Sequence, residues 1–268
     1  MVSASDPLDD FELGAYSGGG FTRDVYRSGE GPNCIVMAEI PGITPRVADF
    51  ARRVRSLGCS VTLPVLFGTP GRPPSPGYIA RSVAKACVSS EFAAFAVGRT
   101  APISLWLRSL AAAEHQRCGG PGVGAVGMCF TGGFALGMMV EEATIAPVLS
   151  QPSLPLGPGR RRAGDVHLAP EDQRAAQARA AEGVCVLGAR FSDDPLSPRR
   201  RFRALEDLLG DNFVGVEIDS SRGNQLGIRR MAHSVLTEDL VDEPGHPTRE
   251  ALDQVLQFLS ERLLPQSD

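Results

Sequence analysis

The fold of this chain follows from one stretch, Gly122-Val-Gly-Ala-Val-Gly-Met-Cys129-Phe-Thr-Gly-Gly-Phe134. Its first half, residues 123–128, is small and apolar and predicts a buried strand, and residues 131–140 predict a helix. Cys129 falls at the junction. A residue in so tight a strand-to-helix turn has a strained backbone, and its neighbours at Gly127, Thr131 and Gly132 must be small. The stretch therefore predicts a nucleophile elbow that presents Cys129 beside the start of a helix, whose dipole favours a thiolate.

Two other interpretations of the same stretch stay open. The glycines at positions 122, 124 and 127 match the G-x-G-x-x-G pattern of dinucleotide-binding proteins, which would make the chain an oxidoreductase. That pattern belongs at the turn between a strand and a helix, whereas residues 124–128 are here predicted to be the strand itself. Alternatively, Cys129 is a buried cysteine at a glycine-rich turn with no catalytic role.

Outward from the elbow, apolar runs alternate with amphipathic segments. Strands are expected at residues 34–40, 59–65, 123–128, 144–149, 184–187 and 213–218. Helices are expected at 44–57, 102–116, 131–140, 199–209 and 248–264, together with an alanine-rich helix that ends at 183. This alternation predicts an α/β fold, a mainly parallel sheet with helices on both faces. We expect an N-terminal tail at residues 1–20 and a single domain at 21–268.

Two irregular segments are expected near the elbow. Residues 67–77 are rich in proline and glycine and predict a surface loop. Residues 151–166 form a polar, proline-rich insertion after a strand. We expect the first segment, together with residues 151–153 of the second, to form the rim of a site.

A nucleophilic cysteine needs a base and an acid that orients the base, and on such a sheet they follow the nucleophile in the order acid, base. After the strand at 184–187, a loop offers Asp193 and Asp194. Asp194 is preferred because it precedes Pro195 in a rigid turn, although Asp193 remains a candidate. After the strand at 213–218, His233 lies in a loop before the last helix and is the candidate base.

These segments together resemble the dienelactone hydrolase family of α/β-hydrolases, over residues 33–264. The family carries Gly-x-Cys-x-Gly-Gly at its elbow, and this chain has one additional small residue, Thr131, between Cys129 and the two glycines. The family's aspartate followed four residues later by proline is matched by Asp194 and Pro198. Its histidine before the closing helix is matched by His233. Its early Glu-Ile-Phe-Gly is matched by residues 39–42, with proline replacing phenylalanine.

The resemblance implies roles for further residues. Glu39 would lie against the Cys129 thiol and help to take its proton, and the backbone N–H groups of Ile40 and Phe130 would form an oxyanion hole. The activity implied is hydrolysis of an ester or lactone by a Cys-Asp-His triad, through a thioester acyl-enzyme. An acid at the end of an apolar strand also suggests from the residues alone that Glu39 has a partner.

The substrate expected from the resemblance is less defined. The family's name substrate carries a carboxylate held by two arginines. One arginine is expected four residues after the catalytic histidine, where this chain has Thr237, and the other in the loop that begins at Leu66-Phe67-Gly-Thr69-Pro70. Arg72, Arg81 or Arg230 could substitute, although each has the pattern of a surface residue. A different or broader ester, thioester or lactone is therefore expected.

Composition excludes several other classes of function. The chain has 268 residues, 43% hydrophobic and 22% charged, with a net charge of -4 and one lysine, which argues against a nucleic-acid partner. No run of about 18 apolar residues and no signal peptide is seen, so no membrane association and a cytoplasmic location are expected. The six cysteines form no C-x-x-C pair, so neither a metal nor a cofactor is expected. A non-catalytic small-molecule-binding module on the same fold remains the alternative, and the oligomeric state is undetermined.

Overall fold

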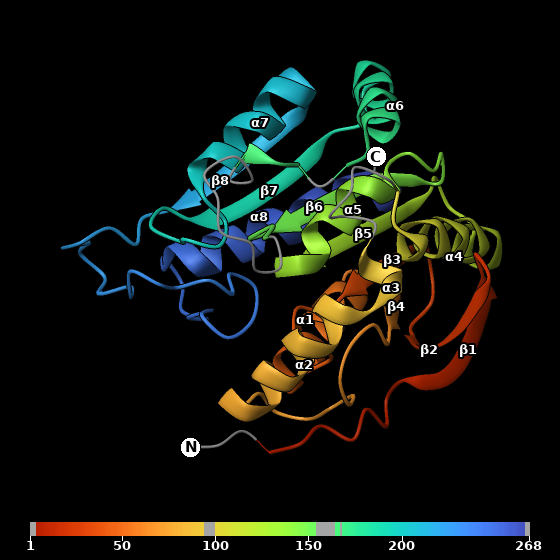
Figure 1. Cartoon of the computed structure of the whole chain (residues 1–268), viewed down its shortest axis with the longest axis horizontal. Helices are drawn as coiled ribbons and strands as arrows, with labels where there is room; N and C mark the ends of the chain where they lie inside the picture. The colour runs from red at the N-terminus through yellow and green to blue at the C-terminus, as the bar shows by residue number, and fades with distance from the viewer. Residues whose placement is uncertain (1–3, 94–99, 154–163, 167, 266–268) are drawn as a thin grey trace.

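A computed structural model describes residues 4–93, 100–153, 164–166 and 168–265 of the chain (Figure 1). At its centre lies one sheet with the order β1-β2-β4-β3-β5-β6-β7-β8. Strands β1 and β2 pair antiparallel, β2 joins β4 antiparallel, and every later pairing is parallel. The strands are β1 Glu12–Gly18, β2 Phe21–Ser28, β3 Asn33–Met37, β4 Ser60–Pro64, β5 Val123–Met128, β6 Thr144–Ser150, β7 Val186–Phe191 and β8 Phe213–Ile218. The expected α/β fold with a mainly parallel sheet is confirmed.

Helices cover both faces of this sheet (Figure 1). Because side chains of a strand alternate between faces, Cys34 and Val36 of β3 pack with α1 and α8. Ile35 and Met37 of the same strand pack with α4 and α5 on the other face. The helices are α1 Pro45–Arg55, α2 Pro76–Val88, α3 Ser90–Ala93, α4 Pro102–Cys118, α5 Gly132–Met138, α6 Pro170–Ala181, α7 Arg199–Leu209 and α8 Pro247–Leu263.

Two glycines of the G-x-G-x-x-G pattern lie in strand β5, and the packing of the strand accounts for the first of them. Gly124 and Gly127 lie within β5 itself, not at the turn that follows it. A Cβ on Gly124 would lie 3.0 Å from the Cys34 sulfur and 3.0 Å from Leu263 of α8. Gly124 therefore allows α8 to approach the sheet, which is a reason for glycine that involves no nucleotide.

The N-terminal segment differs from the expected tail. Residues 12–18 form strand β1 and pair along their whole length with β2, so the boundary expected at residue 21 falls within a hairpin. The ring of Tyr16 lies 5.6 Å from that of Trp106 on α4, and the Tyr16 hydroxyl donates to the carbonyl of Ser109 at 2.8 Å. Sequence patterning missed β1 because an edge strand keeps many side chains exposed and lacks a clear apolar alternation.

Helix α2 also departs from expectation. The loop expected at residues 67–77 ends earlier, since α2 begins at Pro76 with Ser75 as its N-cap. Proline suits the first turn of a helix, where its missing N–H has no intrahelical partner.

Of the insertion expected at 151–166, positions 154–163 lie outside the described residues. Within the described ranges, no helix has both the length and the apolar character needed to cross a bilayer.

Candidate active site

The turn after β5 has the geometry of an elbow. Cys129 has a φ of +55°, a left-handed conformation that costs a residue other than glycine roughly 1–3 kcal/mol. Strand β5 ends at Met128, residues 129–131 form a single 3₁₀ turn, and α5 begins at Gly132. A Cβ on Gly127 would overlap the carbonyl oxygen of Thr131, and one on Gly132 would come within 2.8 Å of the Pro152 Cα. The small residues predicted at the elbow are required by these contacts.

Thr131 ties the elbow to the neighbouring strand. Its hydroxyl lies 3.0 Å from the carbonyl oxygen of Met37 at the end of β3, and it accepts a hydrogen bond of 2.8 Å from the N–H of Met128. Residues 37 and 127 also pair across β3 and β5. Ile40 follows β3 and Phe130 follows Cys129, so the two residues expected to form an oxyanion hole lie after adjacent parallel strands.

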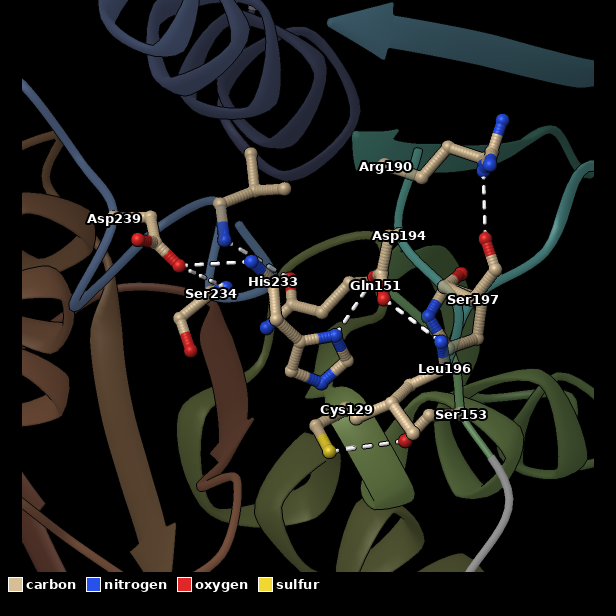
Figure 2. Close-up of polar contacts among 12 residues, drawn as sticks. Cys129, Gln151, Ser153, Arg190, Asp194, Leu196, Ser197, His233, Ser234 and Asp239 are labelled. Atoms are coloured by element: carbon tan, nitrogen blue, oxygen red, sulfur yellow. Dashed lines mark hydrogen bonds and ion pairs between the residues drawn. The ribbon is translucent and has the colours of Figure 1, made fainter. Parts of the chain in front are cut away.

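Asp194 and His233 meet at the same edge of the sheet (Figure 2). Asp194 follows β7, His233 follows β8, and His233 Nδ1 lies 2.7 Å from Asp194 Oδ2. The Asp194 carboxylate is buried, and its other oxygen accepts from the N–H of Leu196 at 2.9 Å. Asp193 instead forms an ion pair of 3.0 Å with Arg230. Of the two aspartates left open by the sequence, Asp194 is the one in contact with His233.

The His233 ring lies between Asp194 and the Cys129 sulfur (Figure 2). Its Nε2 is buried and has no hydrogen-bond partner among the described residues. Burial opposes protonation of this ring, but the negative charge of the Cys129 thiolate and the hydrogen bond with Asp194 outweigh it and raise the pKa of His233 to about 11. The arrangement therefore favours an imidazolium next to the sulfur.

Ser153 contacts the sulfur directly. Its hydroxyl lies 3.0 Å from Cys129 Sγ (Figure 2), and its N–H donates to the Cys129 carbonyl at 2.9 Å. The sequence placed Ser153 at the rim of the site, and nothing in its local pattern indicated a contact with Cys129. Only the parallel pairing of β5 with β6 brings residue 153 next to residue 129.

Glu39 does not make the contact expected for it. Its buried carboxylate accepts from the Ser234 hydroxyl at 2.7 Å, from the Thr237 hydroxyl and from Gln151 Nε2 at 3.3 Å. None of these partners is Cys129. Thr237 occupies the position where the resemblance led us to expect an arginine, and the hydroxyls of residues 234 and 237 draw the carboxylate toward the loop that carries His233. The idea that Glu39 has a buried partner is confirmed, but that partner is the histidine loop.

Two further residues hold the histidine loop, and sequence reasoning missed both. Asp239 Oδ2 accepts from the N–H of His233 at 2.8 Å and from that of Ser234 at 3.0 Å (Figure 2). Gln151 has a φ of +37°, and its side-chain oxygen accepts from the N–H of Val235 at 3.3 Å. An aspartate six residues after a loop histidine is a weak signal for capping of a turn. Gln151 offers no such signal, because its contact comes from a distant segment.

Two buried arginines hold the loop that carries Asp194. Arg190 Nε donates to the Ser197 carbonyl at 2.7 Å (Figure 2). Arg201 donates to the carbonyls of Leu196 and Pro152, at 2.9 and 2.8 Å, and so joins this loop to the segment after β6. Burial lowers the pKa of Arg201 to about 10. In the sequence, residue 201 ends a short basic run, residues 199–201, that gives no sign of this burial.

The described residues contain no group of three or more His, Cys, Asp or Glu side chains that could hold a metal ion.

Cys34 and Cys59 are fully buried, and burial raises the pKa of Cys34 well above its usual value and that of Cys59 to about 11. These two thiols pack in the core. Cys129 differs from them because it is partly exposed and adjoins a histidine and a serine.

Comparison with known proteins gives a match in structure but none in sequence. No family model matches the chain, and no curated protein matches it. Its structure is similar to that of a dienelactone hydrolase from Anabaena variabilis, with a TM-score of 0.59 and 16% identity, covering 95% of this chain and 100% of that one. It is also similar to a dienelactone hydrolase-like promiscuous phosphotriesterase from metagenomic libraries, with a TM-score of 0.56, 17% identity and coverages of 95% and 98%.

A third similar structure is a cold-adapted esterase from an Arctic intertidal metagenomic library. Its TM-score is 0.57 at 12% identity, and the match covers 95% of this chain and 94% of the esterase. At such identities the likeness shows a shared fold. The chain therefore has the α/β-hydrolase fold of the dienelactone hydrolases.

Proposed function

We propose that this protein is a hydrolase of carboxylic esters or lactones that uses Cys129 as its nucleophile, His233 as its base and Asp194 as the acid that orients the base. The observation that carries the proposal is the 2.7 Å hydrogen bond between Asp194 and His233, made beside a cysteine with a φ of +55° at an elbow. The three residues come from segments far apart in the sequence, in the chain order nucleophile, acid, base that is typical of α/β-hydrolases. The proteins of similar structure include esterases and dienelactone hydrolases, which supports the same reaction class.

The reaction proceeds in two steps. The Cys129 thiolate attacks the carbonyl carbon, a C–S bond forms, and the carbonyl π electrons move to oxygen, where the N–H groups of Ile40 and Phe130 stabilise the charge. When the oxyanion collapses, the C–O bond to the alcohol breaks and the His233 imidazolium protonates the leaving oxygen. The product of this step is a thioester on Cys129.

In the second step His233, now neutral, takes a proton from water as the water oxygen attacks the thioester carbonyl. The C–S bond breaks, the carboxylic acid leaves, and the Cys129 thiolate and the imidazolium are restored. Asp194 holds the ring through Nδ1, so that Nε2 points toward the sulfur and the substrate. Glu39 serves as a positioning residue here, since its hydrogen bonds go to residues 234 and 237 of the histidine loop.

The substrate is an uncharged ester, thioester or lactone in this proposal. Residue 237, where the resemblance led us to expect an arginine that holds a substrate carboxylate, is a threonine whose hydroxyl donates to Glu39. Two of the arginines that could replace the missing pair are engaged elsewhere: Arg72 lies 4.4 Å above the ring of Tyr78, and Arg230 pairs with Asp193. Next to Cys129, the ring of Phe130 lies 5.9 Å from that of Phe67, and both belong to one apolar cluster. These apolar neighbours favour an uncharged acyl group over a carboxylate.

The test is hydrolysis of p-nitrophenyl acetate and butyrate by the wild type and by Cys129→Ala, with intact-mass analysis of protein quenched during turnover. We expect a loss of activity on the order of a thousandfold or more in Cys129→Ala, and an acyl adduct on Cys129 in the wild type. Cys118→Ala is the matched control, because Cys118 is also partly exposed but lies at the end of α4. Full activity in Cys129→Ala would refute the proposed nucleophile.

A second measurement covers the case in which these esters do not fit the site. Iodoacetamide should alkylate Cys129 much faster than Cys118, because only Cys129 adjoins an imidazolium. Equal rates for the two thiols would leave the binding module as the better explanation of the fold.

A further inference from the structure

We infer that Ser153 is a further catalytic residue, which donates a hydrogen bond to the Cys129 sulfur and stabilises its thiolate. The inference rests on the proposed function, since it concerns the same nucleophile. It gives the sulfur a hydrogen-bond donor in addition to the nearby His233 ring (Figure 2). None of the sequence motifs indicates this role.

The contact is built into the chain at two points. Ser153 Oγ lies 3.0 Å from Cys129 Sγ, and the N–H of Ser153 donates to the Cys129 carbonyl at 2.9 Å. The serine is 3% exposed, so water does not compete freely for its hydroxyl. Among the described residues, Sγ is the hydrogen-bond partner of that hydroxyl.

The segment that leads to Ser153 is held at residues 151 and 152. Gln151 donates its N–H to the Ala189 carbonyl of β7 at 2.7 Å, and Arg201 donates to the Pro152 carbonyl at 2.8 Å. Pro152 also packs against Gly132, where a Cβ would come within 2.8 Å of the Pro152 Cα. The hydroxyl is therefore preorganised toward the sulfur and needs no rearrangement when charge develops there.

The chemistry fixes the direction of the bond. With a neutral thiol, either atom could donate, but a thiolate has no proton and can only accept. A charge-assisted hydrogen bond is roughly twice as strong as a neutral one, so the serine favours the thiolate over the thiol. Once the sulfur becomes a thioester it is neutral, and the bond weakens. Ser153 therefore increases the fraction of Cys129 that is present as thiolate at a given pH, while water attack still depends on His233.

The other charged groups near the sulfur are His233, from the loop after β8, and Arg201, from α7. Neither is altered by the loss of one hydroxyl at residue 153. Glu39 is directed toward the histidine loop. A change in thiol reactivity in a Ser153 variant is thus attributable to the hydroxyl itself.

The test compares the rate of alkylation of Cys129 by iodoacetamide between pH 5 and pH 10 in the wild type, Ser153→Ala and Ser153→Thr. Without the hydroxyl we expect the midpoint of the profile to move up by about one pH unit, so that the rate at any pH below the wild-type midpoint falls by about tenfold. Ser153→Thr keeps a hydroxyl and should restore most of the rate. Ser104→Ala, a buried serine on α4, is the matched control and should behave as the wild type.

The outcomes separate the inference from the proposed function. If wild-type Cys129 reacts no faster than Cys118, the nucleophile itself is refuted. If Cys129 is fast in the wild type and equally fast, with the same pH profile, in Ser153→Ala, the role of Ser153 is refuted. Circular dichroism melting shows that the variant is folded, and Ser153→Gly, which also lacks the hydroxyl and needs less space, must give the same profile as Ser153→Ala.

Discussion

At the residue scale, His233 combines two opposing effects in one ring. Burial disfavours a charged imidazole, whereas a thiolate on one side and a carboxylate on the other favour it, and the second effect prevails to raise the pKa of His233 to about 11. His233 therefore keeps, in the folded state, a proton that the same side chain would release near neutral pH in an unfolded chain. This difference in proton binding makes the free energy of unfolding depend on pH.

The first prediction concerns the pH dependence of stability. The pKa of His233 is raised from 6.5 to about 11 in the folded state, so its contribution to the free energy of unfolding is complete below pH 6.5 and is lost as the pH rises toward 11. We expect the Tm of the wild type to fall between pH 7 and pH 11 more steeply than that of His233→Gln. Cys129→Ala should also flatten the fall, because the thiolate is the main group that favours the proton. Parallel curves for all three proteins would contradict the assignment.

At the element scale, the site consists of loops after β3, β5, β6, β7 and β8, joined by side chains that cross between them. Glu39 after β3 accepts hydrogen bonds from the histidine loop, and Gln151 after β6 contacts the same loop through its amide. Arg201 on α7 joins the loop with Asp194 to the segment with Ser153. Parallel strands bring these loops to one edge, but the buried polar side chains set their spacing.

The second prediction tests Glu39 as a support of the histidine loop. In Glu39→Gln one carboxylate oxygen is replaced by an N–H₂ group, which would face a hydroxyl or an amide N–H that now donates to Glu39. Two donors that face each other leave a hydrogen bond unmade, which should cost on the order of 1–3 kcal/mol of stability. We expect about a tenfold fall in kcat with little change in KM or in the alkylation rate of Cys129. Glu238→Gln, on the exposed side of the same loop, is the matched control. A large loss of Cys129 alkylation would instead favour the direct action on the thiol that the resemblance implied.

The third prediction concerns the elbow. Gly127→Ala places a Cβ onto the carbonyl oxygen of Thr131, so the turn must open, and we expect loss of activity with a lowered Tm or failure to fold. Gly137→Ala is the control within α5, where the nearest atom to the new Cβ, on Leu168, would be 3.5 Å away. Since alanine is the better helix former, this variant should keep its activity and its Tm. Esterase assays and thermal melting of the two variants give these activities and Tm values. A Gly127→Ala variant that is active and stable would rule out the elbow.

At the scale of the whole molecule, the sheet extends beyond the segment that carries the site. The antiparallel hairpin β1–β2 joins the parallel part through β4. Phe21 of β2 stacks on Trp106 with ring centroids 6.1 Å apart, and Tyr16 of β1 meets the same ring edge-on. Arg27 forms an ion pair of 2.7 Å with the buried Glu114 of α4. The hairpin therefore packs on α4 and covers one edge of the sheet.

The fourth prediction follows from that packing. A chain that lacks residues 1–20 loses β1, exposes the N–H and C=O groups of β2, and frees one side of Trp106. We expect its Tm to fall by about 5 °C or more and its light scattering on heating to rise. A chain that begins at Ala4 keeps β1 and serves as the control. An unchanged Tm after removal of residues 1–20 would show that they act only as a tail.

The amino-acid sequence by itself determined the parallel part of the sheet and the order of the candidate residues. Apolar runs such as 123–128 and 213–218 predicted β5 and β8 with the bounds they have. Strand β5 is wholly buried and wholly apolar, as expected of a strand inside a parallel sheet, whereas β8 at the edge buries only its two ends. Small residues around Cys129 predicted the elbow for the same local, steric reason. The hairpin β1–β2 and helix α2 were missed, because exposed edge strands have weak patterns and because α2 begins with a proline inside a proline-rich stretch.

Tertiary structure alone decided which side chains meet. Asp193 and Asp194 are adjacent in sequence, and only the path of the loop after β7 turns one to Arg230 and the other to His233. Likewise Ser153 approaches Cys129 because β6 lies beside β5. Glu39 turns toward Ser234 because two hydroxyls of a loop almost 200 positions later surround it. Local pattern encodes burial and backbone conformation, whereas contacts between distant loops depend on the packing of the complete sheet.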